Sequence, residues 1–271
     1  MIHLRSARLG AIEIDLTNAF PFDVPVIRSL AGGEIAFASE VTFLVGENGS
    51  GKSTFLEALA CAARSITVGS ESAESDRTLA AVQRLADQLK LSWSARKHRG
   101  FFMRSEDFFG YVKRNRAMRE EFEKELESID EEFAGSSPLA QNLARAPILG
   151  QLAEMQHRYG GDLDERSHGE SYFTLFHSRF VPNGLYLLDE PEAPLSPLRQ
   201  IGLMSLIKTM IEEHNAQFII ATHSPILMAF PNATIYNFDA ETIHTVAYDE
   251  VEHVAVTKAF LDNPQRYLRY L

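Results

Sequence analysis

The residues best suited to chemistry lie between positions 46 and 54, where glycines, a lysine and hydroxyl side chains follow a short apolar run. They match the pattern G-x-x-x-x-G-K-[ST]. Glycines let successive backbone N–H groups point into one small volume that binds anions, and a helix that starts there adds its positive dipole end. Lys52 is then placed to reach the β and γ phosphates of a nucleotide, and the Ser53 hydroxyl to ligate magnesium. We expect a nucleoside triphosphate to be bound by Gly46, Glu47, Asn48, Gly49, Ser50, Gly51, Lys52, Ser53 and Thr54.

Two carboxylates follow a second apolar run, residues 185–188. Such a run is typical of a buried parallel strand, and open α/β sheets bind ligands at the carboxyl ends of their strands. Asp189 is therefore predicted to hold magnesium. Glu190, one residue further, is predicted to orient the water that attacks the γ phosphate or to accept its proton.

A third apolar run, residues 217–221, ends at Thr222-His223-Ser224. A histidine at the end of a core strand faces the same rim of the sheet as Asp189. We expect His223 to donate a hydrogen bond to the γ phosphate and to sense its loss. Lys52, Glu190 and His223 are thus the predicted catalytic residues.

A weaker signal comes from Arg166-Ser167-His168-Gly169-Glu170-Ser171, which precedes a helix-like stretch. A serine and a glycine at a helix start offer a hydroxyl and N–H groups to an anion. Taken alone, this signal is too weak to assign a role to Ser167 and Gly169.

The elements that position these residues indicate an α/β fold with a mostly parallel core sheet flanked by helices. Residues 2–16 alternate in two runs around Gly10 and predict an N-terminal hairpin or strand pair, and residues 78–91 have helical spacing. Residues of about 95–182 read as a helical insertion in a single domain covering 1–271. Phe22, ahead of the phosphate loop, is either a core residue or a stacking partner for the base.

The composition limits the classes of protein to which the chain can belong. The chain has 271 residues, of which 45% are hydrophobic, and a net charge of −11, which argues against general coating of nucleic acid. Its single cysteine, Cys61, reads as a core residue. We find no apolar run long enough to span a membrane and no signal-like N-terminus, so we expect a cytoplasmic protein.

A locally basic region, residues 96–119, precedes a strongly acidic run, residues 120–132. One interpretation is a solvated helix whose charges pair along its faces. The other is that the basic region contacts nucleic acid or an acidic partner protein.

Taken in order, these motifs resemble the ABC-type ATPases, including the SMC, RecF and OLD-type heads. The segments Val45–Thr54, Arg166–Ser171, Leu188–Ala193 and Ile219–Leu227 are also similar to small stand-alone bacterial ATPases of the AAA/ABC-like kind. The resemblance implies a P-loop nucleotide hydrolase that uses ATP and Mg²⁺ and closes as a head-to-tail homodimer, with Ser167 and Gly169 reaching the partner's γ phosphate. It also suggests DNA-related or defence processes.

Alternatives remain within the same resemblance. One is a switch in which ATP drives dimerisation and slow turnover resets it. Another is the ATP-binding subunit of a membrane transporter. His168 and Glu170 depart from the usual signature Leu-Ser-Gly-Gly-Gln, and no clear coupling glutamine precedes the insertion; Arg104 and Glu106 lie at that place.

Overall fold

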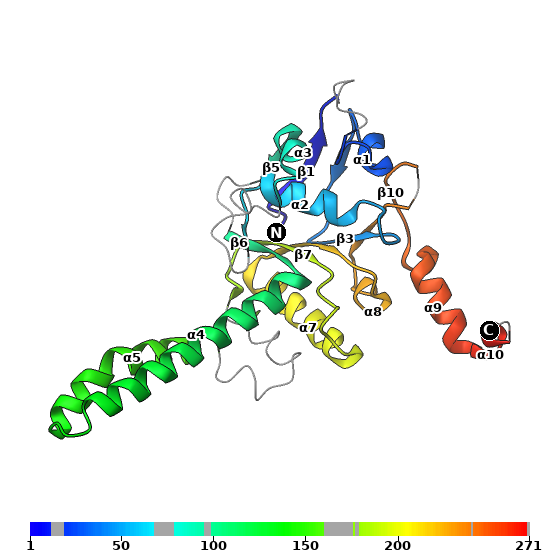
Figure 1. Ribbon diagram of the computed structural model, residues 1–271. Helices are drawn as coiled ribbons and strands as arrows, with labels where there is room; N and C mark the ends of the chain where they lie inside the picture. Colours follow the sequence, from blue (N-terminus) through cyan, green and yellow to red (C-terminus); the bar gives the residue numbers. More distant parts are fainter. Residues whose placement is uncertain are drawn as a thin grey trace. The chain divides into compact units, whose positions relative to one another are not determined.

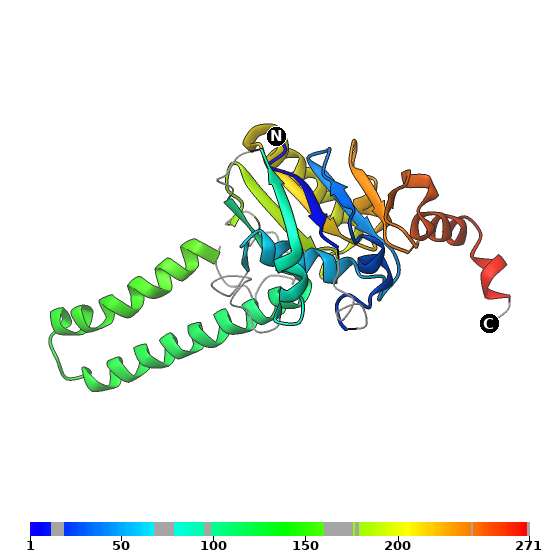
Figure 2. The same cartoon turned by 90° about the horizontal axis from the view of Figure 1, so that it is seen from above.

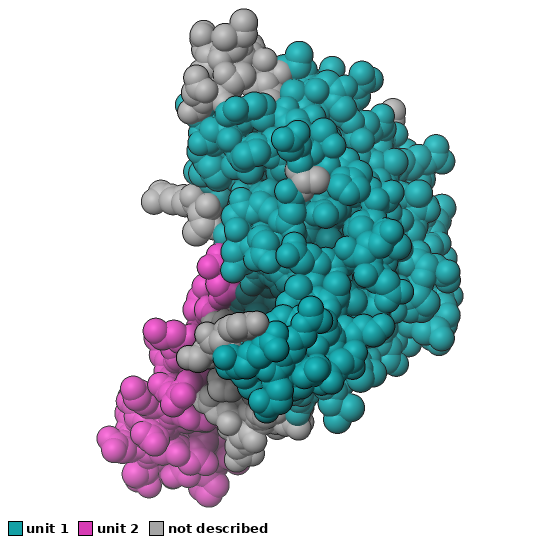
Figure 3. All heavy atoms as spheres, turned by 90° about the vertical axis from the view of Figure 1, so that its right-hand side faces the viewer, with its two compact units in different colours: residues 1–105, 180–271 teal, residues 106–179 magenta. Residues whose placement is uncertain are grey.

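The computed structural model describes residues 1–11, 19–67, 79–94, 99–159, 176, 179–239 and 241–269. The chain divides into two compact units (Figure 3), of which the first comprises Met1–Ser105 and Phe180–Leu271 and the second Glu106–Arg179. Each unit is described by itself below.

The centre of the first unit is a mostly parallel sheet. Among the described residues it has seven strands in the order β10-β9-β3-β8-β7-β6-β4, and only the β9–β10 pair is antiparallel. The strands are β3 (Val41–Val45), β4 (Ile66–Thr67), β6 (Arg99–Arg104), β7 (Gly184–Asp189), β8 (Gln217–Ala221), β9 (Thr234–Asn237) and β10 (His244–Thr245). Every residue of β3, β7 and β8 is buried, because helices or strands cover both faces of the sheet.

Helices lie on both faces of this sheet (Figure 1). On one face α2 (Lys52–Ala62) buries Phe55, Leu56 and Leu59 in the core, where Cys61 also lies, as predicted. On the other face α7 (Pro197–His214) begins with proline after Ser196 and ends at Asn215 in the left-handed conformation. The short helix α8 (Pro225–Met228) repeats the Ser-Pro start.

A small antiparallel sheet, in the order β2-β1-β5, packs against the same core as α2. Its strands are β1 (Leu4–Leu9), β2 (Glu34–Ala36) and β5 (Leu89–Trp93). The predicted fold class, a parallel α/β core with an N-terminal antiparallel part, is confirmed. The second run of the predicted hairpin lies largely in residues 12–18, outside the described part of the chain.

One local prediction was wrong. The predicted helix 78–91 is divided into α3 (Gln83–Gln88) and β5, because Leu89, Leu91 and Trp93 alternate with exposed residues and pair with β1. Of the two alternatives for Phe22, the core residue is confirmed: the side chain is fully buried beside α1 (Pro25–Ser29), so its ring is not available to stack on a base.

The second unit is a helical hairpin of α4 (Ser105–Glu132) and α5 (Pro138–Tyr159), which run antiparallel to one another (Figure 2). Arg145 of α5 pairs with Asp130 of α4. The range of about 95–182 expected for the insertion was too wide at its start, because β6 is a strand of the core sheet.

Three described arginines of the basic region contact carboxylates. Arg104, at the end of β6, is 8% exposed, and Arg116 and Arg119 of α4 pair with Glu120 and Glu123 at 2.9 and 2.8 Å. These pairs follow the interpretation of a helix whose charges pair along its faces. Contact with nucleic acid stays a prediction.

The chain continues after β10 through a 3₁₀ turn (Tyr248–Glu250) into α9 (Glu252–Asp262) and α10 (Pro264–Leu268). Within the described ranges, no helix combines the length and the apolar character needed to cross a membrane.

Gln217, a fully buried side chain at the start of β8, joins the two sheets. Its Oε1 accepts hydrogen bonds from the backbone N–H groups of His3 and Leu4, both at 2.8 Å, and its Nε2 donates to the carbonyl of Leu4 at 2.9 Å. This amide satisfies backbone groups of β1 that would otherwise be buried without partners.

We predict that Gln217→Met, which keeps the volume but loses the hydrogen bonds, lowers the free energy of unfolding by roughly 2–4 kcal/mol. Urea unfolding followed by circular dichroism measures it. The matched control is Gln265→Met on α10, where the side chain is exposed. Equal stability of both variants would show that Gln217 does not hold the sheets together.

Candidate active site

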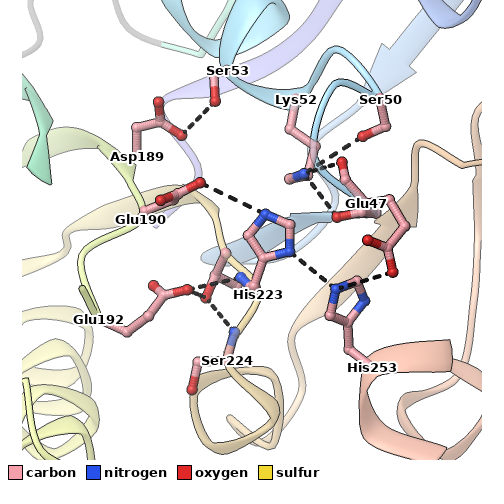
Figure 4. A network of polar contacts seen from close by, with 12 residues as sticks. Glu47, Ser50, Lys52, Ser53, Asp189, Glu190, Glu192, His223, Ser224 and His253 are labelled. Atoms are coloured by element: carbon pink, nitrogen blue, oxygen red, sulfur yellow. Dashed lines mark hydrogen bonds and ion pairs between the residues drawn. The ribbon is translucent and has the colours of Figure 1, made fainter. Parts of the chain in front are cut away.

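The predicted site residues converge because three parallel strands end at the same edge of the sheet. In the register of the sheet, Asp189 of β7 lies opposite Ala221 of β8, and Leu44 of β3 lies opposite Ala221 from the other side. The residues that follow each strand therefore meet (Figure 4). The phosphate loop, the two carboxylates and His223 lie together as predicted from their strand-end positions.

The phosphate loop has the backbone conformation that its glycines permit. Gly51 immediately precedes α2 with a φ of 98°, and a Cβ there would lie 2.7 Å from Val26 Cγ1. At Gly46, with a φ of +149°, a Cβ would lie 2.8 Å from Asp239 Oδ1. Both positions require glycine for space as well as for backbone conformation.

Lys52 is 4% exposed and turns back over the loop. Its Nζ donates to the carbonyls of Gly46 at 2.7 Å and Glu47 at 2.8 Å, with Ser50 Oγ at 3.5 Å. Burial lowers the pKa of the Lys52 ammonium, and surrounding carboxylates, Asp239 foremost, act in the opposite direction. The cation is thus held where the phosphates of a nucleotide would come.

Asp189 and Ser53 form the pair predicted for a metal. Ser53 Oγ donates to Asp189 Oδ1 at 3.1 Å, and Asp189 is 8% exposed. Burial is the main cause that raises the pKa of Asp189 to about 7, while the Ser53 hydrogen bond opposes it. A buried carboxylate with a raised pKa lacks sufficient positive charge around it, and a hard divalent cation with oxygen ligands would supply that charge.

The metal site has few protein ligands. No group of three or more His, Cys, Asp or Glu suited to a metal occurs within the described ranges. Mg²⁺ is usually held by one or two protein groups together with substrate phosphates and water. Ser53 and Asp189 therefore fit Mg²⁺ bound together with a nucleotide.

Glu190 differs from Asp189 in both conformation and exposure. Its φ of 48° lies in the left-handed region, which is uncommon for a residue with a side chain. The side chain is 41% exposed, with Oε1 3.6 Å from His223 Nε2. The turn thus directs Glu190 away from its buried neighbour and toward the histidine (Figure 4).

His223 is fixed through its backbone by Glu192. Glu192 Oε1 accepts from the His223 N–H at 2.7 Å and from Thr222 Oγ1 at 2.6 Å, and burial raises the pKa of this carboxyl. Within the described structure, the buried Nε2 of His223 has no hydrogen-bond partner. A ring nitrogen without a partner can form a hydrogen bond with a ligand that enters between Glu190 and Lys52.

Three further residues of the site were not predicted. Glu192 lies two residues after Glu190. Asp239 follows β9 and accepts from the Glu47 N–H at 2.6 Å; its place after another parallel strand is a signal that could have found it. His253 of α9 contacts His223 at 3.1 Å, and no sequence pattern marks it.

Two sets of predicted residues have a different outcome. Ser167 and Gly169 lie outside the described residues. Arg104, considered in place of a coupling glutamine, lies opposite Asp189 in the sheet register, and its Nη1 is 3.4 Å from Glu57 Oε1.

Models of known protein families match two segments of the chain, and both segments contain residues of the site. A family model described as "AAA domain" matches residues 26–77, which contain the phosphate loop. A model described as "AAA domain, putative AbiEii toxin, Type IV TA system" matches residues 158–229, which contain Asp189, Glu190 and His223. Two segments of the chain thus match models of AAA domains. These matches indicate nucleotide binding and hydrolysis, and the predicted resemblance to P-loop ATPases is confirmed.

Solved structures similar to this chain include two SMC heads and a transporter cassette. The Smc head domain of Pyrococcus furiosus bound to the C-terminal domain of ScpA is 13% identical, with 96% of this chain and 100% of that chain covered and a TM-score of 0.46. The SMC head of Thermotoga maritima is 15% identical over 90% and 98%, with a TM-score of 0.44. An ATP-binding cassette of an ABC transporter in its ADP conformation is 16% identical over 97% and 98%, with a TM-score of 0.47.

A search of curated proteins found no match. Because the TM-scores of these structures lie below 0.5, we base the function on the geometry of the site.

The raised pKa of Asp189 makes stability depend on pH. Its value of about 7 lies above the usual 3.8, so between about pH 4 and 7 the folded protein binds more protons than the unfolded chain and becomes less stable as pH rises. We predict that, without nucleotide or Mg²⁺, Asp189→Asn raises the free energy of unfolding at pH 8 by at least about 1 kcal/mol.

Urea unfolding at pH 5 and pH 8 tests this. Glu190→Gln, the same chemical change at an adjacent but 41% exposed side chain, is the matched control and should change stability little. If Asp189→Asn does not change the free energy of unfolding at pH 8, burial of the ionised Asp189 carboxylate does not destabilise the folded protein.

Proposed function

We propose that this protein is a Mg²⁺-dependent ATPase of the ABC type. The observation that carries the proposal is the convergence of four groups at one sheet edge: the Lys52 loop, the Ser53–Asp189 pair, Glu190 and His223. A phosphate loop alone would support nucleotide binding. The addition of a carboxylate and a histidine beyond the metal pair supports hydrolysis.

Lys52, Ser53 and the N–H groups of the loop bind and orient the triphosphate. To reach the phosphates, the Lys52 ammonium exchanges its carbonyl partners of Gly46 and Glu47 for phosphate oxygens. Ser53 Oγ and Asp189 Oδ1 would hold Mg²⁺ when it is bound, and the metal would neutralise charge that develops on the β and γ phosphates.

Glu190 orients the attacking water and accepts its proton. Its exposed carboxylate suits this better than the buried Asp189, which faces Ser53. His223 donates a hydrogen bond from Nε2 to the γ phosphate, where charge is to be stabilised. These contributions are those of positioning and electrostatics, which dominate phosphoryl transfer.

The proposal includes a head-to-tail homodimer. The described residues of the site are the phosphate loop, the carboxylates Asp189 and Glu190, and His223. Ser167 and Gly169 of a second copy would close the remaining side against the γ phosphate, as the resemblance to ABC-type ATPases implies. ATP would then hold two chains together until it is hydrolysed.

We predict that Glu190→Gln lowers kcat for ATP hydrolysis by about 100-fold or more, because the amide cannot accept the proton of the attacking water. The affinity for ATP should change little, since the phosphate-binding groups remain. Steady-state phosphate release and equilibrium binding of a fluorescent ATP analogue measure the two quantities. Glu213→Gln, on an exposed position of α7, is the control. Unchanged kcat in Glu190→Gln would rule out this residue as the base.

The dimer is tested in the Glu190→Gln background, in which ATP persists. We predict that ATP and Mg²⁺ convert this variant from monomer to dimer, as measured by analytical ultracentrifugation. Adding Gly169→Asp places a carboxylate against the partner's γ phosphate and should prevent pairing while ATP binding is kept.

Gly135→Asp, between α4 and α5, introduces the same side chain into open space and serves as the control. A monomer in the Glu190→Gln variant under all conditions would contradict the dimer. A dimer combined with slow turnover in the parent protein would favour the switch over a rapid hydrolase.

A further inference from the structure

His253 lies against the predicted phosphate-sensing histidine. It belongs to α9, and its Nε2 is 3.1 Å from Nδ1 of His223, with ring centroids 5.0 Å apart at an angle of 54°. Both side chains are largely buried, with 24% of His223 and 20% of His253 exposed. A hydrogen bond between the two rings is the only direct polar link from α9 to His223 among the described residues.

The distance between the two nitrogens restricts the protons. At 3.1 Å two ring nitrogens share one hydrogen, because two N–H groups would clash and two lone pairs would repel. A neutral imidazole carries one N–H, on either Nδ1 or Nε2. The tautomer of one ring therefore determines which nitrogen of the other ring carries the proton.

The surroundings of His223 decide which ring donates. Its Nε2 faces the carboxylate of Glu190 at 3.6 Å, and an ionised carboxylate only accepts, so the proton belongs on Nε2. Burial, followed by the charge of the Lys52 ammonium, lowers the pKa of His223 and favours its neutral ring. A neutral ring with Nε2–H has a lone pair on Nδ1, so the shared hydrogen comes from His253.

The surroundings of His253 also favour donation from His253. Its Nε2 also lies 3.7 Å from Oε1 of Glu47, a residue of the phosphate loop. A negative oxygen beside Nε2 favours a proton there as well. Glu190 thus faces Nε2 of His223 and Glu47 faces Nε2 of His253, and each carboxylate favours a proton on the nitrogen that it faces (Figure 4).

We propose that His253 is a positioning residue, which donates from Nε2 to Nδ1 of His223 and so keeps the His223 N–H on Nε2, directed at the γ phosphate. The proposal rests on the proposed role of His223. It adds a residue from α9 to the site and gives it a defined task. Without His253 the His223 ring can turn over or take the other tautomer, and its donor is then misdirected.

The test compares His253→Gln with His253→Met. The Gln amide can donate from a position close to that of Nε2, whereas Met has a similar size and no donor. We expect kcat to fall by about 10-fold or more in His253→Met, with KM for ATP nearly unchanged, and to recover largely in His253→Gln. In a His223→Ala background, His253→Met should cause no further loss, because the group it positions is gone.

The second measurement is independent of hydrolysis. Nitrogen-15 NMR of the labelled histidine rings should show Nε2–H and an unprotonated Nδ1 for His223 in the parent and in His253→Gln, and a mixture or an altered Nδ1 signal in His253→Met. Thermal unfolding of each variant establishes that it is folded.

The outcomes are separable. Unchanged His223 signals in folded His253→Met, or equal loss of kcat in the Gln and Met variants with the same spectra, would overturn the proposal and leave His253 as a packing residue. If the parent protein does not hydrolyse ATP, the proposed function fails, while the NMR comparison still decides whether His253 fixes the tautomer of His223.

Discussion

The parallel pairing of β3, β7 and β8 is the constraint on which the site depends. Because these strands run in the same direction, their carboxyl ends share one edge, and the chain must leave each strand there. The phosphate loop, the carboxylates and the histidine are therefore neighbours, although the loop lies well over a hundred residues before the other two groups in the sequence. The buried side chains of all three strands stabilise this alignment from both faces.

The same edge concentrates negative charge around one lysine. Asp189, Glu190, Asp239 and Glu47 all act on the pKa of Lys52 in the direction that favours its charged form. A triphosphate would add several more negative charges to this region. The arrangement is consistent with joint binding of nucleotide and a divalent cation, since each compensates for the charge of the other.

Sequence reasoning was strongest where chemistry depends on neighbouring residues. The glycines and Lys52 stand in one short segment, and Asp189, Glu190 and His223 directly follow apolar strands, so local pattern was enough to bring them together. It was weakest where contacts with residues distant in the sequence determine the local structure or the members of the site. Leu89 and Leu91 fit a helical spacing until pairing with β1 makes them part of a strand. Asp239 and His253 enter the site through contacts with residues 192 and 30 positions away, which spacing alone cannot reveal.

The contacts that the phosphate loop makes within the chain contribute to its affinity for a nucleotide. Lys52 already has two carbonyl partners, and the N–H of Glu47 already has the carboxylate of Asp239. Binding of a nucleotide would therefore exchange interactions, and its affinity would be the difference in free energy between two states in which these groups have partners. The internal contacts also order the loop during folding, so little conformational entropy remains to be lost on association. A nucleotide that enters this loop would therefore replace contacts that already exist in a loop that is already ordered.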